Sequence, residues 1–583
     1  MRILRMKRMV CIGCCLCFSI AVLGQGNGNA GKSEALTGKN KYPQDAFRSP
    51  MDIPLVLAGS FGELRSNHFH SGIDIKTQQR EGLPIYAIGD GSVTRIRVAH
   101  WGYGKALYIT HPNGYTSVYG HLQKFGPEIE EYVKKVQYLK KSYEVQEYPD
   151  YGKLKVKKGQ IIAYGGNTGG SSGPHLHFEI RNSISEKPTN PLLYGFEVRD
   201  ATNPILLKLF AYPLSDNAQV NESANRIQLD FKRQDDGTFL AEKVNAIGTI
   251  GLGFMGYDRQ DLAANRNGVY QVTQSVNGKT QTDYDFETFS FGETRYLNTL
   301  IDYDYYGRYR QRIQKLFKGP GNRLDIYNTL ENDGKIEVGE GLSYNVELLI
   351  KDLHGNQVKA IIPIEGKRET LTAEKDIEKT ENYVVAKKPN NFDLGAARVN
   401  FPSNTFYDDF YIDLKKDDDT VTIHNSRVAA HRNFTITFDV SDYSEQEKEK
   451  MFIARLDSRL RPDHASTYKR GNTFTTRTRN LGTYTLAKDT IAPRIRPKNF
   501  KDNQHLNNYH YLSLYISDDL SGVDTYSATL NGDWILMEYE PKTNTLTYNF
   551  DDVILDKKEC NLSLTVTDNV GNSTTFDSTF YRK

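Results

Sequence analysis

The chain has 583 residues and a mass of 66.3 kDa, which is enough for about four domains at roughly 150 residues each. Its 37 Tyr and 27 Phe are too many for a disordered chain. The formal net charge is +2, and four of the positive charges precede any acid, so the remainder carries 2 − 4 = −2. That balance argues against nucleic acid as the main partner, because phosphate binding needs a concentrated positive field.

Residues 1–24 are predicted to be an export signal. Basic residues up to Arg8 precede an apolar run from Met9 to Leu23, which is too short to span about 30 Å of hydrocarbon as a stable helix. An uncleaved membrane anchor is the alternative. Lipidation is disfavoured, because the four cysteines of this segment lie inside the apolar run and not at a cleavage point: Cys11, Cys14, Cys15 and Cys17. No later stretch is long or apolar enough to span a membrane, so we expect an exported protein, in the periplasm or secreted.

Residues 40–199 alternate short apolar runs with Gly, Asn and Pro turns, which predicts an antiparallel β domain. The runs KALYITHP and YTSVYGHL flank Asn113 and Gly114, a pair that favours a tight hairpin turn. The exception is residues 127–143, where apolar side chains recur at helical spacing. We therefore predict a helix within an insertion at about residues 125–151.

Residues 200–583 are predicted to form further β-sandwich domains, at 200–375, 376–488 and 489–583. The first and last of these resemble each other, and both end with a strand followed by Asp-x-x-Gly-Asn. Such spacing fits immunoglobulin-like sandwiches, so the whole chain is expected to be mostly β. The residues Asp352, Gly355, Asn356 and their counterparts Asp568, Gly571, Asn572 could form calcium loops. We favour the alternative, Asx-type turns between strands.

The histidines are concentrated in one part of the chain. Seven of the 13 lie within residues 68–177, where an even spread would place about 2.5. In an exported protein without redox chemistry this concentration points to zinc, whose ligands are His, Asp, Glu and Cys. The seven are His68, His70, His100, His111, His121, His175 and His177.

The segment GGSSGPHLHFEIRN predicts a strand with His175, His177 and Glu179 on one face and apolar residues on the other. One imidazole can bind a metal while its neighbour contacts whatever occupies the open coordination position. The alternative is an exposed strand with two incidental histidines.

The segment NHFHSGIDI places His70 and Asp74 four residues apart around Gly72, which disfavours a helix interior. A tight loop could bring Asp74 beside His70. Together with one imidazole of the His175/His177 pair, they would form a two-His, one-carboxylate site with a fourth position left for water, the pattern of catalytic zinc. His68 is a rival ligand, and His121, at the end of a hairpin strand, is available as a further imidazole.

The sequences HSGID, YGHL and GNTGGSSGPHLHFEI, in that order, resemble the LytM/lysostaphin-type zinc metalloendopeptidases, which cut peptide bonds in bacterial cell walls. The resemblance covers about residues 48–195. It implies an antiparallel β core with a groove, and one zinc ion held by His70, Asp74 and His177. It also implies that His121 and His175 are the catalytic pair, with the roles of general base and oxyanion stabiliser left open between them.

This sequence departs from the family in one respect. His121 and His175 are 54 residues apart, because of the helical insertion, which we expect beside the groove, where it could narrow or occlude the cleft. The glycine-rich GGNTGGSSG lacks the Lys-Ser/Thr ending of a phosphate loop, and a strand follows it, so phosphate binding is disfavoured.

The sequence therefore predicts an exported zinc-dependent endopeptidase that hydrolyses stem or cross-link peptides of peptidoglycan. One alternative is a non-catalytic envelope scaffold or activator of other cell-wall hydrolases, with envelope proteins bound through the C-terminal β domains. Another is a peptidase that acts on proteins such as Gly-rich extracellular matrix.

Overall fold

The computed structural model describes residues 41–376, 378–395, 397–417, 420–552 and 558–582. These residues are mostly β, as the sequence predicts. The predicted export signal lies outside them. In the described part of the chain, no helix combines the length and hydropathy needed to cross a bilayer. We call residues 41–199 the N-terminal region, 200–375 the second region, 376–488 the third region and 489–582 the C-terminal region.

The N-terminal region is built on an 11-stranded sheet with the order β1-β2-β10-β6-β5-β4-β7. Every strand pair in it is antiparallel, which confirms the prediction. The predicted hairpin at Asn113-Gly114 joins β5 to β6. The strands are β1 (Leu57–Gly59), β2 (Ile73–Lys76), β3 (Pro84–Tyr86), β4 (Gly91–Val98), β5 (Lys105–Thr110), β6 (Tyr115–Phe125), β7 (Val145–Glu147), β8 (Lys155–Val156), β9 (Ile161–Gly165), β10 (His175–Asn182) and β11 (Pro188–Thr189).

The predicted helix is present as α1 (Pro127–Lys140). It begins at a proline, whose missing N–H costs nothing at a first helical position, and it ends where Lys141 takes a left-handed conformation. Ile129 and Val133 are buried, whereas Leu139 at the end of the same apolar series is 81% exposed.

The second region contains a 13-stranded sheet with the order β14-β12-β17-β24-β23-β18-β19-β21, in which the long strand β17 pairs with β12 along one part and with β24 along another. Short helices α2 (Leu297–Leu300) and α3 (Tyr303–Tyr309) follow β19. The strands are β12 (Ile205–Pro213), β13 (Gln219–Val220), β14 (Ile227–Leu229), β15 (Phe231–Arg233), β16 (Phe239–Ala241), β17 (Val244–Tyr257), β18 (Gln271–Val276), β19 (Lys279–Asp285), β20 (Gln314–Lys315), β21 (Tyr327–Leu330), β22 (Ile336–Val338), β23 (Ser343–Lys351) and β24 (Gln357–Gly366).

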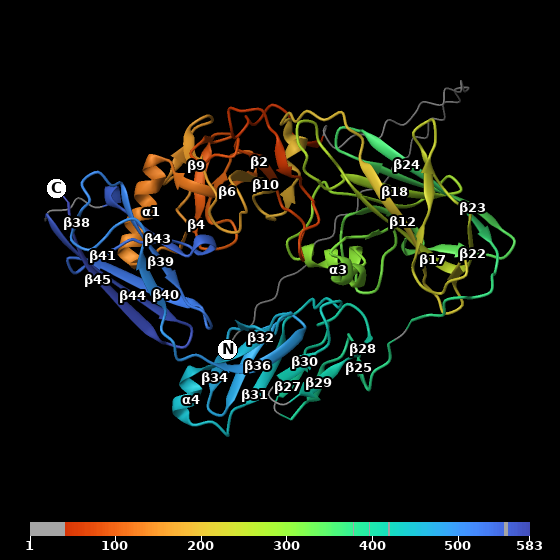
Figure 1. Cartoon of the computed structure of the whole chain (residues 1–583). Helices are drawn as coiled ribbons and strands as arrows, with labels where there is room; N and C mark the ends of the chain where they lie inside the picture. The colour runs from red at the N-terminus through yellow and green to blue at the C-terminus, as the bar shows by residue number, and fades with distance from the viewer. Residues whose placement is uncertain (1–40, 377, 396, 418–419, 553–557, 583) are drawn as a thin grey trace, which may run out of the picture.

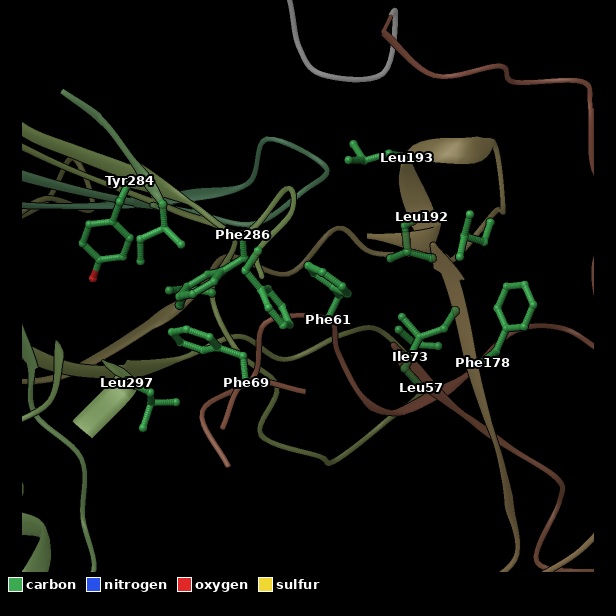
Figure 2. Packing of buried hydrophobic residues seen from close by; sticks show 14 of the residues in the cluster. Leu57, Phe61, Phe69, Ile73, Phe178, Leu192, Leu193, Tyr284, Phe286 and Leu297 are labelled. Atoms are coloured by element: carbon green, nitrogen blue, oxygen red, sulfur yellow. The ribbon is translucent and has the colours of Figure 1, made fainter. Parts of the chain in front are cut away.

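The hydrophobic core runs without a break from the N-terminal region into the second region. Figure 2 shows Phe61 and Phe69 of the first packed toward Phe286 of the second. The ring centroids of Phe69 and Phe286 are 5.4 Å apart, within the range of favourable aromatic pairs. The two regions therefore form one hydrophobic core, in which each region buries apolar side chains of the other.

The third region packs two five-stranded sheets around a separate core. Its helix is α4 (Glu445–Lys450), which Ser444 and Glu447 cap reciprocally. The strands are β25 (Asn382–Val384), β26 (Asn390–Asp393), β27 (Ala397–Phe401), β28 (Phe410–Ile412), β29 (Leu414–Asp417), β30 (Thr420–Ile423), β31 (Phe434–Asp439), β32 (Met451–Leu456), β33 (Pro462–His464), β34 (Tyr468–Arg470), β35 (Thr473–Thr478) and β36 (Gly482–Lys488).

The C-terminal region packs a four-stranded and a five-stranded sheet around its own core. The strands are β37 (Arg494–Pro497), β38 (Gln504–His505), β39 (Tyr511–Ser517), β40 (Val523–Leu530), β41 (Asp533–Ile535), β42 (Glu538–Glu540), β43 (Thr545–Asn549), β44 (Glu559–Asp568) and β45 (Ser573–Tyr581). The predicted domain limits and the immunoglobulin-like character of these sheets stay predictions.

The four regions contact one another in a closed cycle (Figure 1). The ring of Tyr296 in the second region stacks on His431 of the third, with centroids 4.5 Å apart. Phe452 of the third region and Val570 of the C-terminal region share a small apolar cluster. The C-terminal region then returns to the N-terminal region, where Leu536 is buried in the shared core and Trp534 packs edge-on against Tyr138 of α1.

Candidate active site

Three of the predicted side chains meet at the pairing of β2 with β10. His70 precedes β2, Asp74 lies in it, and the register places His177 of β10 directly opposite Asp74. The backbones approach closely here, because a Cβ at Gly72 would lie 2.3 Å from the Phe178 carbonyl oxygen. His70 Nε2, Asp74 Oδ1 and His177 Nδ1 are each 3.0 Å from the other two.

The other ring nitrogen of each imidazole is committed elsewhere. His70 Nδ1 donates to the Ser60 carbonyl at 2.8 Å, and His177 Nε2 donates to Glu179 Oε1 at 2.7 Å. Both inward-facing nitrogens therefore present lone pairs toward the same carboxylate oxygen, an arrangement that needs a shared proton or a cation.

The three atoms fit a zinc ion. Ligand atoms held at about 2.0–2.2 Å in tetrahedral geometry lie about 3.3 Å apart, close to the 3.0 Å separations found here. All three residues are buried.

The two carboxylate oxygens of Asp74 have different partners. Oδ1 faces the imidazoles, whereas Oδ2 accepts a hydrogen bond from Arg65 Nη2 at 2.9 Å. Burial raises the pKa of this carboxyl, but the surrounding imidazoles of His70, His175 and His177 outweigh burial and hold the pKa well below its usual range. Asp74 is therefore anionic, as a metal ligand must be.

Without a metal, the pKa of His177 lies above its usual value. Burial alone would lower the pKa, but the hydrogen bonds to Asp74 and Glu179 reverse this effect and raise the pKa to about 9. In that state the shared position is occupied by a proton. A metal ion must displace that proton, so metal binding is expected to release it.

His121 and His175 face each other beside the three-residue cluster, with ring centroids 4.7 Å apart. The His121 Nδ1–H donates to the Thr168 carbonyl, and the His175 Nδ1–H donates to the Gly173 carbonyl, both at 2.8 Å. Each ring therefore keeps an Nε2 lone pair. His175 Nε2 lies 3.5 Å from Asp74 Oδ1.

Strained backbone presents His121 to the site. Its φ of +59° lies in the left-handed region, next to irregularities in the pairing of β6 with its neighbours, and such bulges redirect side chains. Burial, followed by the nearby His177 and His175, lowers the pKa of His121 to about 3. The ring is therefore neutral near pH 7, and the lowered pKa makes it a weaker base than an ordinary imidazole.

Glu179 lies behind His177 and is completely buried. Its Oε1 accepts hydrogen bonds from the ring of His177, from the Ser71 hydroxyl at 2.7 Å and from the Tyr103 hydroxyl. Its Oε2 accepts from Arg181 Nε at 2.6 Å. Tyr103 also stacks on the His177 ring, with centroids 4.7 Å apart. The orientation of His177 is thus held from two sides.

A groove of about 1000 Å³ opens onto these residues. The N-terminal region supplies most of its lining, including the loop from Gly170 to Pro174. The second region supplies Asn265, Phe291 and Thr294. None of the described residues that line the groove belongs to 125–151, so the expectation that the insertion borders the groove is wrong. The helix α1 instead packs against the C-terminal region (Figure 1).

Five of the seven clustered histidines line the groove, and His100 and His111 lie elsewhere. His68 is among the five, but its exposed ring donates to the Ser66 carbonyl at 2.8 Å and stays outside the three-residue cluster. The roles of His70, Asp74 and His177 as ligands, and of His121 and His175 as the catalytic pair, stay predictions.

Sequence reasoning did not identify Arg65, Tyr103 or the groove residues of the second region. Arg65 lies in the FGELRSNHFHSGID segment but carries no spacing signal that links it to Asp74. Tyr103 and Phe291 reach the site through the tertiary fold alone.

Comparison with known proteins identifies this part of the chain. The family described as "Peptidase family M23" matches residues 68–149 and 150–191. The chain therefore contains a peptidase family M23 domain, of the LytM/lysostaphin type. A second family, described as "Zu5-like domain", matches residues 381–489.

Two curated relatives match over the same part. The DD-carboxypeptidase/endopeptidase Mpg of Neisseria meningitidis is 33% identical over 139 residues, which is 24% of this chain and 26% of the relative. The peptidoglycan DD-endopeptidase ShyB of Vibrio cholerae is 38% identical over 148 residues, 24% of this chain and 27% of the relative. The chain thus spans about a quarter of the length of these relatives.

A solved structure also matches part of the chain. It is the crystal structure of the catalytic domain of the M23 protein EnpA from Enterococcus faecalis, which is 27% identical with a TM-score of 0.20. The match covers 26% of this chain and 98% of that domain.

Proposed function

We propose that the protein is an exported endopeptidase with one zinc ion per chain, which hydrolyses peptide bonds in the stem or cross-link peptides of peptidoglycan in the cell envelope. The observation that carries the proposal is the convergence of His70 Nε2, Asp74 Oδ1 and His177 Nδ1, 3.0 Å apart, at the floor of an open groove. The DD-endopeptidase names of the relatives support D-Ala-containing cross-links as substrate.

A zinc ion held by these three residues would polarise the scissile carbonyl and make a water molecule a nucleophile near neutral pH. The proton transfers would be carried out by side chains of the protein. His121 and His175 each hold an Nδ1 proton against a backbone carbonyl, so the Nε2 atom of either ring can take a proton from the attacking water.

After that transfer the same ring, now protonated at Nε2, can donate that proton to the leaving amine. The partner ring can stabilise the developing oxyanion only when it carries a proton on its own Nε2, because its Nδ1–H is held by a backbone carbonyl. The Asp74 carboxylate lies 3.5 Å from His175 Nε2, so this ring is adjacent to the proposed zinc ligands. Phe291 and Thr294 of the second region form part of the groove that holds the peptide.

The proposal is tested with purified mature protein and isolated sacculi. We expect new amino groups to be released, chelation to stop their release, and zinc to restore it. His70→Ala and His177→Ala should lose both bound zinc and activity, whereas His505→Ala, an exposed histidine of the C-terminal region, should keep both. Full activity after stringent metal removal would contradict the proposal.

Mass spectrometry of the released muropeptides identifies the bond. Cleavage between a D-Ala residue and the next stem is the expected result. Cleavage of Gly-Gly peptides alone would favour the extracellular-protein alternative. The non-catalytic alternative receives no support from the site, because all three predicted ligands and both further imidazoles are present and brought together.

A further inference from the structure

A second cluster of acidic side chains lies where the second region begins. Asp200 precedes β12, Asp258 follows β17, and Asp352 follows β23. Ligand atoms of Asp200, Asp352 and His354 lie within 4.8 Å of one another. The side chain of Asp200 is 1% exposed, and Asp352 and Asp258 are 4% and 5% exposed. Asp200 and Asp352 are thus buried close to each other, and both act electrostatically on the buried Asp258.

The C-terminal region repeats this arrangement with Asp489, Asp518 and Asp568. In both clusters an Asn of the Asp-x-x-Gly-Asn sequence, Asn356 or Asn572, donates to the third aspartate at 2.7 Å and to the backbone carbonyl of the first. The third aspartate caps its own Asx-type turn in each case, as the preferred sequence interpretation has it.

The two clusters differ in how the remaining oxygens are satisfied. In the C-terminal region, Asp518 Oδ2 accepts from the backbone N–H groups of Leu520 and Gly522, and Asp489 Oδ2 accepts from Ser521 N. The corresponding oxygens of the second region, Asp258 Oδ1 and Asp200 Oδ2, are buried and have no hydrogen-bond partner in the part of the chain that the structure describes.

Among the described residues, no Lys or Arg side chain pairs with Asp200, Asp258 or Asp352. Asp258 faces the charges of Asp200 and Asp352 and accepts a hydrogen bond from the backbone N–H of Arg259. Asp200 faces Asp352, Asp261 and one histidine, His354, whose Nδ1 is 3.9 Å away, and its Oδ1 accepts from the backbone N–H of Thr202. Burial, and then this mutual repulsion, raise the pKa of Asp258 to about 8 and that of Asp200 to about 6. An unpaired buried carboxylate is costly unless a cation neutralises it.

We propose that Asp200, Asp258 and Asp352 bind a calcium ion at the junction of the N-terminal and second regions. Calcium takes six to eight oxygen ligands at about 2.3–2.6 Å, and the carboxylate oxygens of Asp200 and Asp352 lie within 4.8 Å of each other, close enough to share one ion. Asp258 is near enough for both carboxyls to act on it electrostatically, and its buried Oδ1 has no hydrogen-bond partner among the described residues. Gln260 Oε1 and Asn267 Oδ1, in the segment after Asp258, are also buried without hydrogen-bond partners among the described residues.

The site has a consequence for the groove. The segment from Asp258 carries Asn265, which lines the groove and donates to the Ala58 carbonyl at 3.1 Å. Calcium would therefore fix one wall of the groove relative to the N-terminal region. The ion itself takes no part in peptide hydrolysis, so this inference stands or falls independently of the proposed function.

The experiment measures thermal unfolding and calorimetric binding of the full mature chain, loaded with zinc, with and without calcium. We expect calcium to raise the unfolding temperature by several degrees at about 100 times its Kd. Asp258→Asn should abolish this rise. In chelator, the same variant should unfold at a temperature no lower than that of the wild type, because Asn replaces a carboxyl whose burial already raises its pKa to about 8. Asp518→Asn is the matched control in the C-terminal cluster and should keep the calcium response.

Three results would overturn the assignment. The first is no calcium-dependent rise up to about 10 mM, which would mean that the carboxyls are protonated instead. The second is an unchanged rise in Asp258→Asn, or its loss only in Asp518→Asn. The third is a response to added zinc but not to calcium that disappears in His354→Gln, which would make this a nitrogen-containing zinc site.

Discussion

At the scale of single residues, the site depends on which nitrogen of each imidazole is already engaged. His70 presents Nε2 and His177 presents Nδ1, because Ser60 and Glu179 hold the opposite nitrogens. Outer partners of this kind fix ring orientation and ligand basicity. The alternation of His175, His177 and Glu179 along one strand was visible in the sequence, but the function of Glu179 as the partner of His177 was not.

Replacing Glu179 tests this arrangement. We expect Glu179→Gln to weaken zinc binding about 10- to 100-fold, because the amide no longer polarises the His177 ring as a carboxylate does. Competition with a chromophoric chelator measures the affinity. Tyr103→Phe removes one hydroxyl from the same carboxylate and should have a smaller effect. Unchanged affinity in Glu179→Gln would show that the carboxylate does not support the ligand.

At the scale of elements, the insertion helix and the edge of the C-terminal region form a joint surface. Lys105 of β5, buried beneath it, pairs with Glu538 of β42 at 2.8 Å. Lys542 donates to the carbonyls of Asn167 and Ser171, in the loop whose Ser171 hydroxyl lies 3.1 Å from His175 Nδ1. The C-terminal region thus contacts the loop that orients a proposed catalytic imidazole.

Glu538→Gln is expected to destabilise the protein by about 1–2 kcal/mol, because it leaves the Lys105 ammonium buried without its charged partner while Glu538 itself is partly exposed. Asp519→Asn breaks an exposed pair with Arg494 in the same region and should change stability by less than about 0.5 kcal/mol. Urea unfolding compares the two variants. Equal effects would mean that the Lys105 pair contributes no more than a surface ion pair.

The junction of the second and third regions should be sensitive to acid. Burial, and then Arg295, Arg432, Arg479 and Arg323, lower the pKa of His431 to about 4. The unfolded chain binds a proton on this residue near pH 6.5 and the folded chain does not, so stability is present above that pH and is lost as pH falls toward about 4.

We expect the unfolding temperature of the wild type to fall more steeply between about pH 7 and 5 than that of His431→Gln, which cannot take up the proton. Calorimetric scans across this range provide the measurement. A parallel pH dependence in both proteins would exclude His431 as a source of acid sensitivity.

At the scale of the whole molecule, the core shared by the N-terminal and second regions makes the peptidase domain dependent on the second region for its stability. Phe61 and Phe69 pack against Phe289 and Phe286 across the junction, with centroids 5.0 and 5.4 Å apart. Removing the second region would expose Phe61 and Phe69 to solvent and remove one wall of the groove.

A fragment that ends at residue 199 is therefore expected to be largely insoluble or partly unfolded, whereas one that ends at residue 375 should fold and bind zinc. Circular dichroism and zinc titration of both fragments test this. A soluble, zinc-binding fragment ending at residue 199 would show that the shared core is dispensable.

The sequence by itself determined the mostly β character, the antiparallel N-terminal sheet, the helix near residue 127 and the residues that gather at the groove. These features depend on local periodicity and on short sequences whose spacing reflects strand geometry, so a single chain reveals them. Only the tertiary structure decided where the insertion helix packs, which residues of the second region line the groove, and why Asp258 lacks the partners that Asp518 has. Such facts depend on contacts between segments that are distant in the chain, and the pattern of neighbouring residues carries no record of those contacts.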